Sequence, residues 1–193
     1  MGDQMEITLE TGNRTVVQRI GRGPAALRGA GAVISACGQY RYRLWRGARP
    51  GRQAVFVMCN PSTADACEDD ATVRKCRGFA ERWGCTGFEV VNVCAYRSTN
   101  PRDLLDINDP VGPENREALD AALCESRRWG EPMVVVAWGS ALPKSLRHHA
   151  ETMLGWLEAF GAEPHCLGVT KADGQPRHPL MLAYSTPLER FHG

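Results

Sequence analysis

Three continuous apolar runs constrain the fold of this chain more than any other feature. They lie at residues 54–59 (AVFVMC), 88–94 (FEVVNVC) and 133–138 (MVVVAW). Runs of this length with little polar alternation are typical of parallel strands that helices cover on both faces. A chain that alternates such strands with helices folds most economically as an α/β domain with a mainly parallel sheet.

The segments between these runs carry the signals of helices. A helix is predicted over residues 70–83, with Asp69 or Asp70 as its N-cap and Gly84 at its end. A second helix is predicted over residues 113–129 and a third over 146–160, which ends at Gly161. Residues 165–169 are expected to form a fourth, shorter strand.

The N-terminal part of the chain favours hairpins. Residues 32–37 and 40–45 are β-rich runs joined at Gly38-Gln39, which is a hairpin signature. Residues 1–30 are polar and Gly-rich, and we interpret them as a separate arm or hairpin. The predicted architecture is therefore a single α/β domain over residues 31–193. It is a three-layer sandwich with a central, mainly parallel sheet of about four strands plus an N-terminal hairpin.

The composition is that of an ordinary globular chain. Of the 193 residues, 43% are hydrophobic and 23% are charged, and the formal net charge is +1. A chain of this length buries enough surface to fold without a metal or a disulfide. The small net charge gives no global basic field for nucleic acid, although Lys and Arg clustered on one face would still attract it.

The eight cysteines are spaced too widely for the common zinc and iron–sulfur sites, because no C-x-x-C pair occurs. We therefore expect free, reduced cysteines, no metal and no cofactor. The chain opens with no signal peptide, and no apolar run reaches about 18 residues. These features favour a cytoplasmic protein without a membrane partner, and we expect a monomer.

Polar residues follow each of the four predicted strands. The carboxyl ends of parallel strands meet at one edge of an open α/β sheet, so these groups are expected to line one crevice. They comprise Asn60, Pro61, Ser62 and Asp65 after the first run, Asn92, Tyr96 and Arg97 at the second, Trp138, Gly139 and Ser140 at the third, and Lys171, Arg177 and His178 after the fourth.

Structural roles compete with functional ones at three of these positions. Asn60 precedes a proline and is compatible with a simple turn. Asn92 interrupts an apolar strand, where an unpaired amide costs about 1–3 kcal/mol unless a structural hydrogen bond satisfies it. His178 is compatible with an ordinary loop residue. A serine nucleophile is not indicated at Ser140, because the G-x-S-x-G elbow is missing.

In their order along the chain, these motifs resemble those of the uracil-DNA glycosylase superfamily. The matching segments are NP at 60–61, VVN at 90–92, AWGS at 137–140 and HPL at 178–180. Residues 34–190 also resemble a family of bacterial and phage proteins, domain-of-unknown-function family 1643, through the segments NPSTAD, VVNVCAYR, DPVGPEN and AWG. The first resemblance implies a glycosylase-like fold and a DNA-base-processing enzyme that hydrolyses the N-glycosidic bond of a damaged or modified base.

The resemblance also implies roles for individual residues. In the superfamily the Asn-Pro or Asp-Pro motif positions the attacking water, which places this role on Asn60. The Asn that ends the second strand reads the base edge, and the His of the His-Pro motif contacts the base and the DNA. These two roles fall on Asn92 and His178, and His178 is expected to stabilise the departing base anion.

An amide cannot accept the proton of the attacking water, so a carboxylate such as Asp65, Asp69 or Asp70 is expected to assist. We assign Asp65 to catalysis with Asn60 and His178. Tyr96 is the candidate for stacking on the base. The assigned base-binding residues are Pro61, Ser62, Asn92, Tyr96, Trp138, Gly139 and Ser140, and the assigned phosphate contacts are Arg97, Lys171 and Arg177.

Two other classes of function remain open at this stage. The crevice is also compatible with a non-catalytic module that binds a nucleic acid or a nucleotide, and Asn in place of Asp at position 60 favours it. It is further compatible with an enzyme that acts on free nucleosides or another small metabolite. For the DNA-base-processing enzyme and for the binding module, the expected partner is DNA or a nucleotide.

Overall fold

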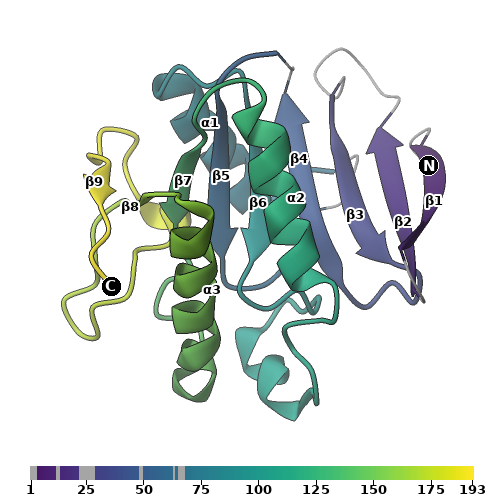
Figure 1. The fold of residues 1–193 in the computed structure, drawn as a ribbon. Helices are drawn as coiled ribbons and strands as arrows, with labels where there is room; N and C mark the ends of the chain where they lie inside the picture. The colour runs from purple at the N-terminus through teal and green to yellow at the C-terminus, as the bar shows by residue number, and fades with distance from the viewer. Residues whose placement is uncertain (1–3, 12–13, 22–28, 48–49, 63, 65–67) are drawn as a thin grey trace.

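A computed structural model describes residues 4–11, 14–21, 29–47, 50–62, 64 and 68–193. Among these residues the backbone forms one mixed sheet of nine strands in the order β1-β2-β3-β4-β6-β5-β7-β8-β9 (Figure 1). The strands are β1 (Gln4–Thr11), β2 (Arg14–Gly21), β3 (Gly31–Ser35), β4 (Arg41–Gly47), β5 (Gln53–Met58), β6 (Gly87–Asn92), β7 (Met133–Val136), β8 (Pro164–Cys166) and β9 (Glu189–Arg190).

The centre of the sheet is parallel and its flanks are antiparallel. Strand β5 pairs in parallel with β6 and β7, and β7 pairs in parallel with β8. On the other side of β6, strand β4 runs antiparallel, and β3 and β2 continue in the same way. The α/β class is confirmed. The expectation of a mainly parallel sheet of about four strands is wrong, because the sheet is mixed and larger.

The expected hairpin at residues 32–37 and 40–45 explains this difference. It exists as β3 and β4, but β4 also pairs with β6 and so extends the central sheet. The pairing buries Tyr42 and Leu44 completely. Local alternation predicted the hairpin, whereas its docking on β6 is a long-range pairing that no local pattern encodes.

The helices begin and end close to the predicted positions. They are α1 (Ala71–Arg82), α2 (Asn115–Arg127) and α3 (Arg147–Phe160), and the 3-10 turns are η2 (Pro101–Asp106), η3 (Lys144–Leu146) and η4 (Pro179–Met181). Asp70 caps α1, because its side chain accepts the backbone N–H of Val73 at 2.8 Å. Gly161 ends α3 in the left-handed conformation, with φ of 76°.

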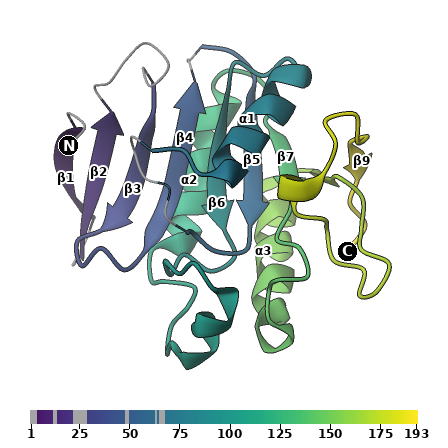
Figure 2. The ribbon, with the colours of Figure 1, turned by 180° about the vertical axis from the view of Figure 1, so that it is seen from behind.

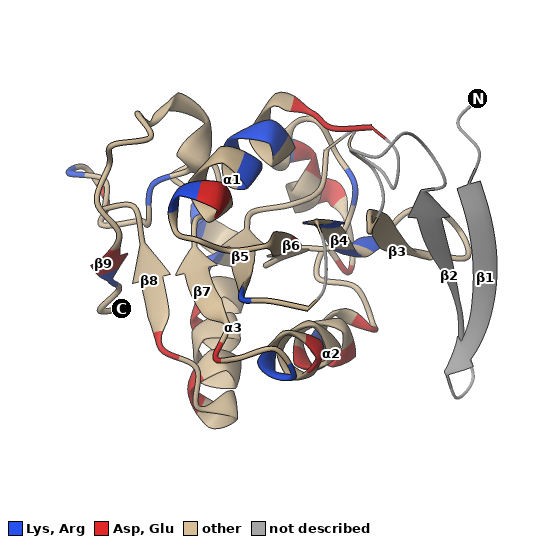
Figure 3. Ribbon diagram, turned by 90° about the horizontal axis from the view of Figure 1, so that it is seen from above, with Lys and Arg blue, Asp and Glu red and all other residues tan. Residues whose placement is uncertain are grey.

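The helices cover both faces of the sheet, which gives three layers (Figures 2 and 3). On one face, Val73, Cys76 and Phe79 of α1 pack with Phe56 and Phe88 of the sheet. On the other face the apolar side chains of α2 and α3, including Leu119, Leu123, Met153 and Leu157, pack with Val55, Val57 and Val91. The strands between these layers are therefore completely buried, as the apolar runs predicted.

None of the described helices is both long and apolar enough to cross a bilayer. Within the described ranges, no three His, Cys, Asp or Glu side chains are grouped as ligands of a metal ion.

Candidate functional site

The register of the central strands brings the predicted polar residues to one edge of the sheet. Met58 of β5 lies opposite Asn92 of β6. The pairing continues past the strand ends, since the N–H groups of Val93 and Cys94 donate to the carbonyls of Met58 and Cys59 at 2.8 and 2.9 Å. The segments that follow β5 and β6 therefore leave the sheet side by side.

A pocket of about 350 Å³ opens at this edge. Five of the predicted site residues line it, and they come from four separate segments of the chain: Asn60, Ser62, Asn92, Trp138 and His178. Arg41, Thr72, Ser98 and Thr99 are polar lining residues that sequence reasoning had not named, and Asp70, one of the three carboxylates that it had considered, also lines the pocket. Residues 60, 92 and 178 thus line one cavity.

Asn92 is the most unusual group in the pocket. Its side chain is 1% exposed, and its Nδ2 has no hydrogen-bond partner within the described part of the chain. The Asn92 carbonyl accepts a hydrogen bond from Nδ2 of Asn115 at 2.9 Å, so the backbone is held while the side-chain donor is not. An unsatisfied buried donor costs about 1–3 kcal/mol. No hydrogen bond to a described residue therefore satisfies this donor, and it is available to an acceptor in the pocket.

Asn60 is oriented by two backbone carbonyls. Its Nδ2 donates to the carbonyls of Ser98 at 2.8 Å and Pro61 at 3.2 Å. The amide nitrogen is consumed by these contacts, and Oδ1 has no partner among the described residues. Asn60 thus stabilises the turn after β5, and its Oδ1 remains as an unpaired acceptor in a residue that lines the pocket.

The ring of His178 is fixed in one tautomer by its own loop. Nδ1 accepts the backbone N–H of Leu180 at 3.3 Å, which places the proton of the neutral imidazole on Nε2. Burial lowers the pKa of His178 below its ordinary value of 6.5, and the nearby Asp70 carboxylate opposes this shift. Gly139, with φ of 70°, lies against the ring's attachment point, because a Cβ there would lie 3.1 Å from Cβ of His178.

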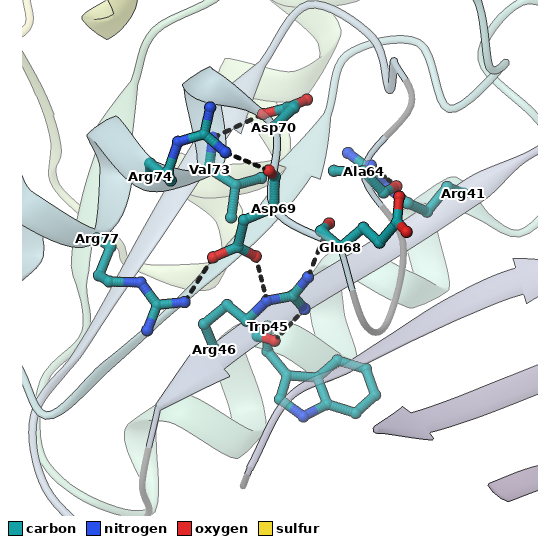
Figure 4. A network of polar contacts seen from close by, with 10 residues as sticks. All are labelled: Arg41, Trp45, Arg46, Ala64, Glu68, Asp69, Asp70, Val73, Arg74 and Arg77. Carbon is teal, nitrogen blue, oxygen red and sulfur yellow. Dashed lines mark hydrogen bonds and ion pairs between the residues drawn. The ribbon is translucent and has the colours of Figure 1, made fainter. Parts of the chain in front are cut away.

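The two candidate carboxylates Asp69 and Asp70 have different hydrogen-bond partners (Figure 4). Asp65 lies outside the described residues. Asp69 accepts from Nε of Arg46 at 2.7 Å and from Nη2 of Arg77 at 2.6 Å, which occupies both of its oxygens. Asp70 accepts the N–H of Val73 with Oδ1 and lines the pocket. Of the two candidate carboxylates that the structure describes, Asp70 is therefore the one that lines the pocket.

Arg41 reaches the pocket from β4, a strand that sequence reasoning had treated as part of a separate hairpin. Its side chain is nearly completely buried at 3% exposed, and its Nη1 donates to the carbonyl of Ala64 at 2.5 Å. Sequence reasoning did not place Arg41 in the pocket because the pairing of β4 with β6 is a long-range contact, which a local sequence pattern does not show. Ser98 and Thr99 could have been found from the sequence, since they lie in the loop that follows the second strand.

Several predicted site residues do not line the pocket. Tyr96 packs edge-on against Tyr40, with ring centroids 5.6 Å apart, so it is not placed to stack on a ligand there. Ser140 donates to Oδ1 of Asp173 at 3.0 Å, and Arg97 donates to the carbonyl of Gly38 at 3.2 Å. The others outside the lining are Pro61, which is buried, Gly139 in the turn against His178, and Lys171 and Arg177, which are exposed.

Trp138 and Cys59 form apolar parts of the wall. Trp138 is 2% exposed, and its Nε1 donates to Oε1 of Gln175 at 2.9 Å, so its indole N–H is satisfied without a ligand. Burial raises the pKa of the Cys59 thiol to about 12. Cys59 thus stays protonated at neutral pH and is unsuited to act as a nucleophile.

The chain is similar to a known family of proteins. A family model described as "Protein of unknown function (DUF1643)" matches residues 41–180. These limits coincide with Arg41 and Leu180, the first and last pocket-lining residues along the chain. No curated protein and no solved structure matches the chain.

Replacing Asn92 by Leu is expected to stabilise the ligand-free protein against unfolding. The substitution removes an unpaired buried donor and keeps a similar volume, so the free energy of unfolding should rise by about 1 kcal/mol. Urea denaturation measures this change. The matched control is Asn115→Leu, which removes the hydrogen bonds to the carbonyls of Asn92 and Val93 and should lower stability. Equal destabilisation by both variants would contradict the unpaired state of Nδ2.

The pKa of His178 is expected below 6.5, measured by NMR titration of the imidazole C–H resonances. Asp70→Asn should lower this pKa further, because the carboxylate favours the protonated ring. The unfolded chain binds the proton more tightly than the folded one. The contribution to stability is therefore present above pH 6.5 and is lost as the pH falls through the folded pKa. A titration midpoint above 6.5 would contradict this assignment.

Proposed function

This chain belongs to the DUF1643 family, and we propose that it is a DNA-base-processing enzyme that hydrolyses the N-glycosidic bond of a damaged or modified base. The unpaired Nδ2 of Asn92, at the wall of a pocket that also holds Asn60 and His178, carries this proposal. The order of the motifs along the chain, which resembles the uracil-DNA glycosylase superfamily, supports it further.

The pocket suits a planar heterocycle extruded from the strand. Enzymes that act on a base take it out of the stack and read its hydrogen-bonding edge in a tight cavity. In the proposed complex Nδ2 of Asn92 donates to a carbonyl oxygen of the base and so gains its missing partner. The Nε2–H of His178 donates to a second carbonyl, because Nδ1 is already engaged by Leu180.

Bond cleavage places charge where these donors lie. The electron pair of the C–N bond stays with the departing base, and its carbonyl oxygens become more negative. Donors that are already oriented in a cavity shielded from water stabilise such charge without reorganisation. The neutral state of His178 suits this role, since it provides a donor while keeping Nδ1 free of a proton.

We assign the binding and deprotonation of the attacking water to Asn60 and Asp70. Oδ1 of Asn60 accepts one hydrogen bond from a water molecule, whose oxygen forms the new bond to the sugar carbon. The amide cannot take up the proton, and Asp70 is the lining carboxylate that can accept it. The products are then the free base, the sugar with a hydroxyl group, and one proton transferred to Asp70.

The second candidate is a non-catalytic module that binds a modified base or a nucleotide in the same pocket. It is favoured by Asn at position 60, which positions a water but cannot deprotonate it. The formal net charge of +1 also fits a protein that contacts few phosphates.

Base release from oligonucleotides that carry uracil, hypoxanthine or hydroxymethyluracil tests the proposal, read as alkali-labile strand cleavage. Asn60→Ala and His178→Ala should each reduce the rate by about 100-fold or more, because each removes a group that acts on water or leaving base. His148→Ala, which changes an exposed histidine of α3, should leave the rate unchanged. Binding without release from any substrate would favour the non-catalytic module instead.

Asp70→Asn separates the proposed proton acceptor from the helix cap. Asn caps a helix as well as Asp does, so α1 and the fold should be retained. The release rate should fall by about 100-fold or more, while the affinity for the free base stays close to that of the wild type. Thermal unfolding and calorimetric binding provide these two controls. Full activity of this variant would exclude Asp70 as the proton acceptor.

A further inference from the structure

Helix α1 presents two basic side chains, Lys75 and Arg82, against one aromatic ring. They are about two helical turns apart and so lie on the same side of the helix. Nζ of Lys75 lies 4.1 Å and Cζ of Arg82 lies 4.0 Å from the ring centroid of Tyr184. Arg82 also donates from Nη1 to the carbonyl of Gly78 at 2.8 Å. Neither residue forms an ion pair with a carboxylate in the described part of the chain, so two positive charges are held close together here.

The ring of Tyr184 restricts the orientation of both cations. It packs directly on the backbone of α1 at Gly78, where a Cβ atom would lie 2.5 Å from the Tyr184 side chain. Phe79 contacts the ring edge to face, with centroids 5.1 Å apart. A cation over an aromatic face is attracted by the negative charge density of the ring. The side chains of Lys75 and Arg82 are therefore oriented before any partner binds, and we call these two residues with Tyr184 the Tyr184 stack.

The Tyr184 stack lies beside the pocket, because both of the segments that form it also line the cavity. Thr72 of α1 lines the pocket and comes one helical turn before Lys75. Leu180 of η4 lines the pocket as well, and the chain reaches Tyr184 four residues later. Figure 3 shows the basic segments of α1 on the face of the sheet opposite α2 and α3.

The acidic residues of this region have other positions or partners. Glu81 is next to Arg82 in the sequence, but successive residues of a helix point in different directions. Glu81 borders a separate small cavity together with Arg77. Asp69 is paired with Arg77, and Asp70 lines the pocket. The surface of the Tyr184 stack is therefore suited to an anionic partner.

We propose that the Tyr184 stack binds the phosphodiester backbone of the DNA strand whose base enters the pocket. Two phosphates of that strand accept hydrogen bonds from Lys75 and Arg82. Phosphates fit because they are permanent anions that offer acceptors, whereas the ammonium and guanidinium groups offer only donors. The inference deepens the proposed function and rests on it in that the partner is DNA. It does not depend on cleavage of the glycosidic bond.

The salt dependence of binding to a short labelled single strand tests this contact. The variant Lys75→Gln/Arg82→Gln removes both charges, and fluorescence anisotropy measures Kd between about 50 and 200 mM salt. At the lowest salt Kd should rise by roughly tenfold or more, and the slope of log K against log salt should become shallower by about 1.4, or about 0.7 per phosphate contact. The loss should be the same for strands with uracil and with thymine, because phosphate contacts do not read the base.

A matched variant controls for the change in net charge. Arg127→Gln/Arg128→Gln removes two exposed charges at the end of α2, on the opposite face of the sheet. Its Kd should stay within about twofold of the wild-type value, with an unchanged slope. Thermal unfolding shows whether each variant is folded. If the variant of the Tyr184 stack is not, Lys75→Gln alone replaces it, with an expected change in slope of about 0.7.

The outcomes separate this inference from the proposed function. Wild-type affinity and slope in the variant of the Tyr184 stack would overturn the inference and leave base hydrolysis untouched. Weaker binding by this variant, without base release from any substrate by the wild type, would support the inference while hydrolysis fails. Polyglutamate binding as tight as that of the oligonucleotide, and lost in the same variant, would assign the surface to an acidic protein segment and overturn the DNA contact. Failure of the wild type to bind any oligonucleotide would overturn both.

Discussion

The parallel pairing of β5 with β6 beneath helices on both faces is the constraint on which the rest of the structure depends. Both strands are completely buried, so an unpaired polar side chain within them is costly. The register that places Met58 opposite Asn92 fixes where the chain leaves the sheet on both strands. Asn60 and Asn92 face one cavity because of this register, and the turns after β7 and before η4 complete it with Trp138 and His178.

The pocket's polar groups share one design, in which part of each side chain contacts the backbone and part remains for a ligand. Asn60 donates to two carbonyls, His178 accepts the Leu180 N–H, and Asp70 accepts the Val73 N–H. These contacts fix the orientation of the remaining atoms before any ligand binds. Preorganisation of this kind is what makes a small polar cavity effective, because no free energy is then needed to orient its groups during binding or reaction. Asn92 differs from these three residues, because its side-chain nitrogen has no hydrogen-bond partner among the described residues.

Strand β4 brings unusual charge into the interior. Arg43 pairs with Glu89 of β6 and with Glu125 of α2, and Arg46 pairs with Asp69 ahead of α1. The network around Asp69 ties β4 to the segment that positions the cap of α1 (Figure 4). Buried ion pairs of this kind contribute little net stability but are costly to break. Arg41 lies on the same strand and lines the pocket, so β4 also contributes to the wall of the cavity.

The amino-acid sequence alone determined the α/β class, the three central strands, the limits of the helices to within a few residues, and the grouping of Asn60, Asn92, Trp138 and His178 at one edge. Periodicity, capping residues and the parallel-sheet rule are sufficient for this, because each depends on local chain geometry. Only the tertiary structure decided that β4 joins β6, that Arg41 therefore enters the pocket, that Asp70 rather than Asp69 lines it, and that Tyr96 packs on Tyr40 instead. These outcomes depend on which segments that are distant in the sequence pair with one another, and on which side chains then come into contact. A local sequence pattern does not contain this information.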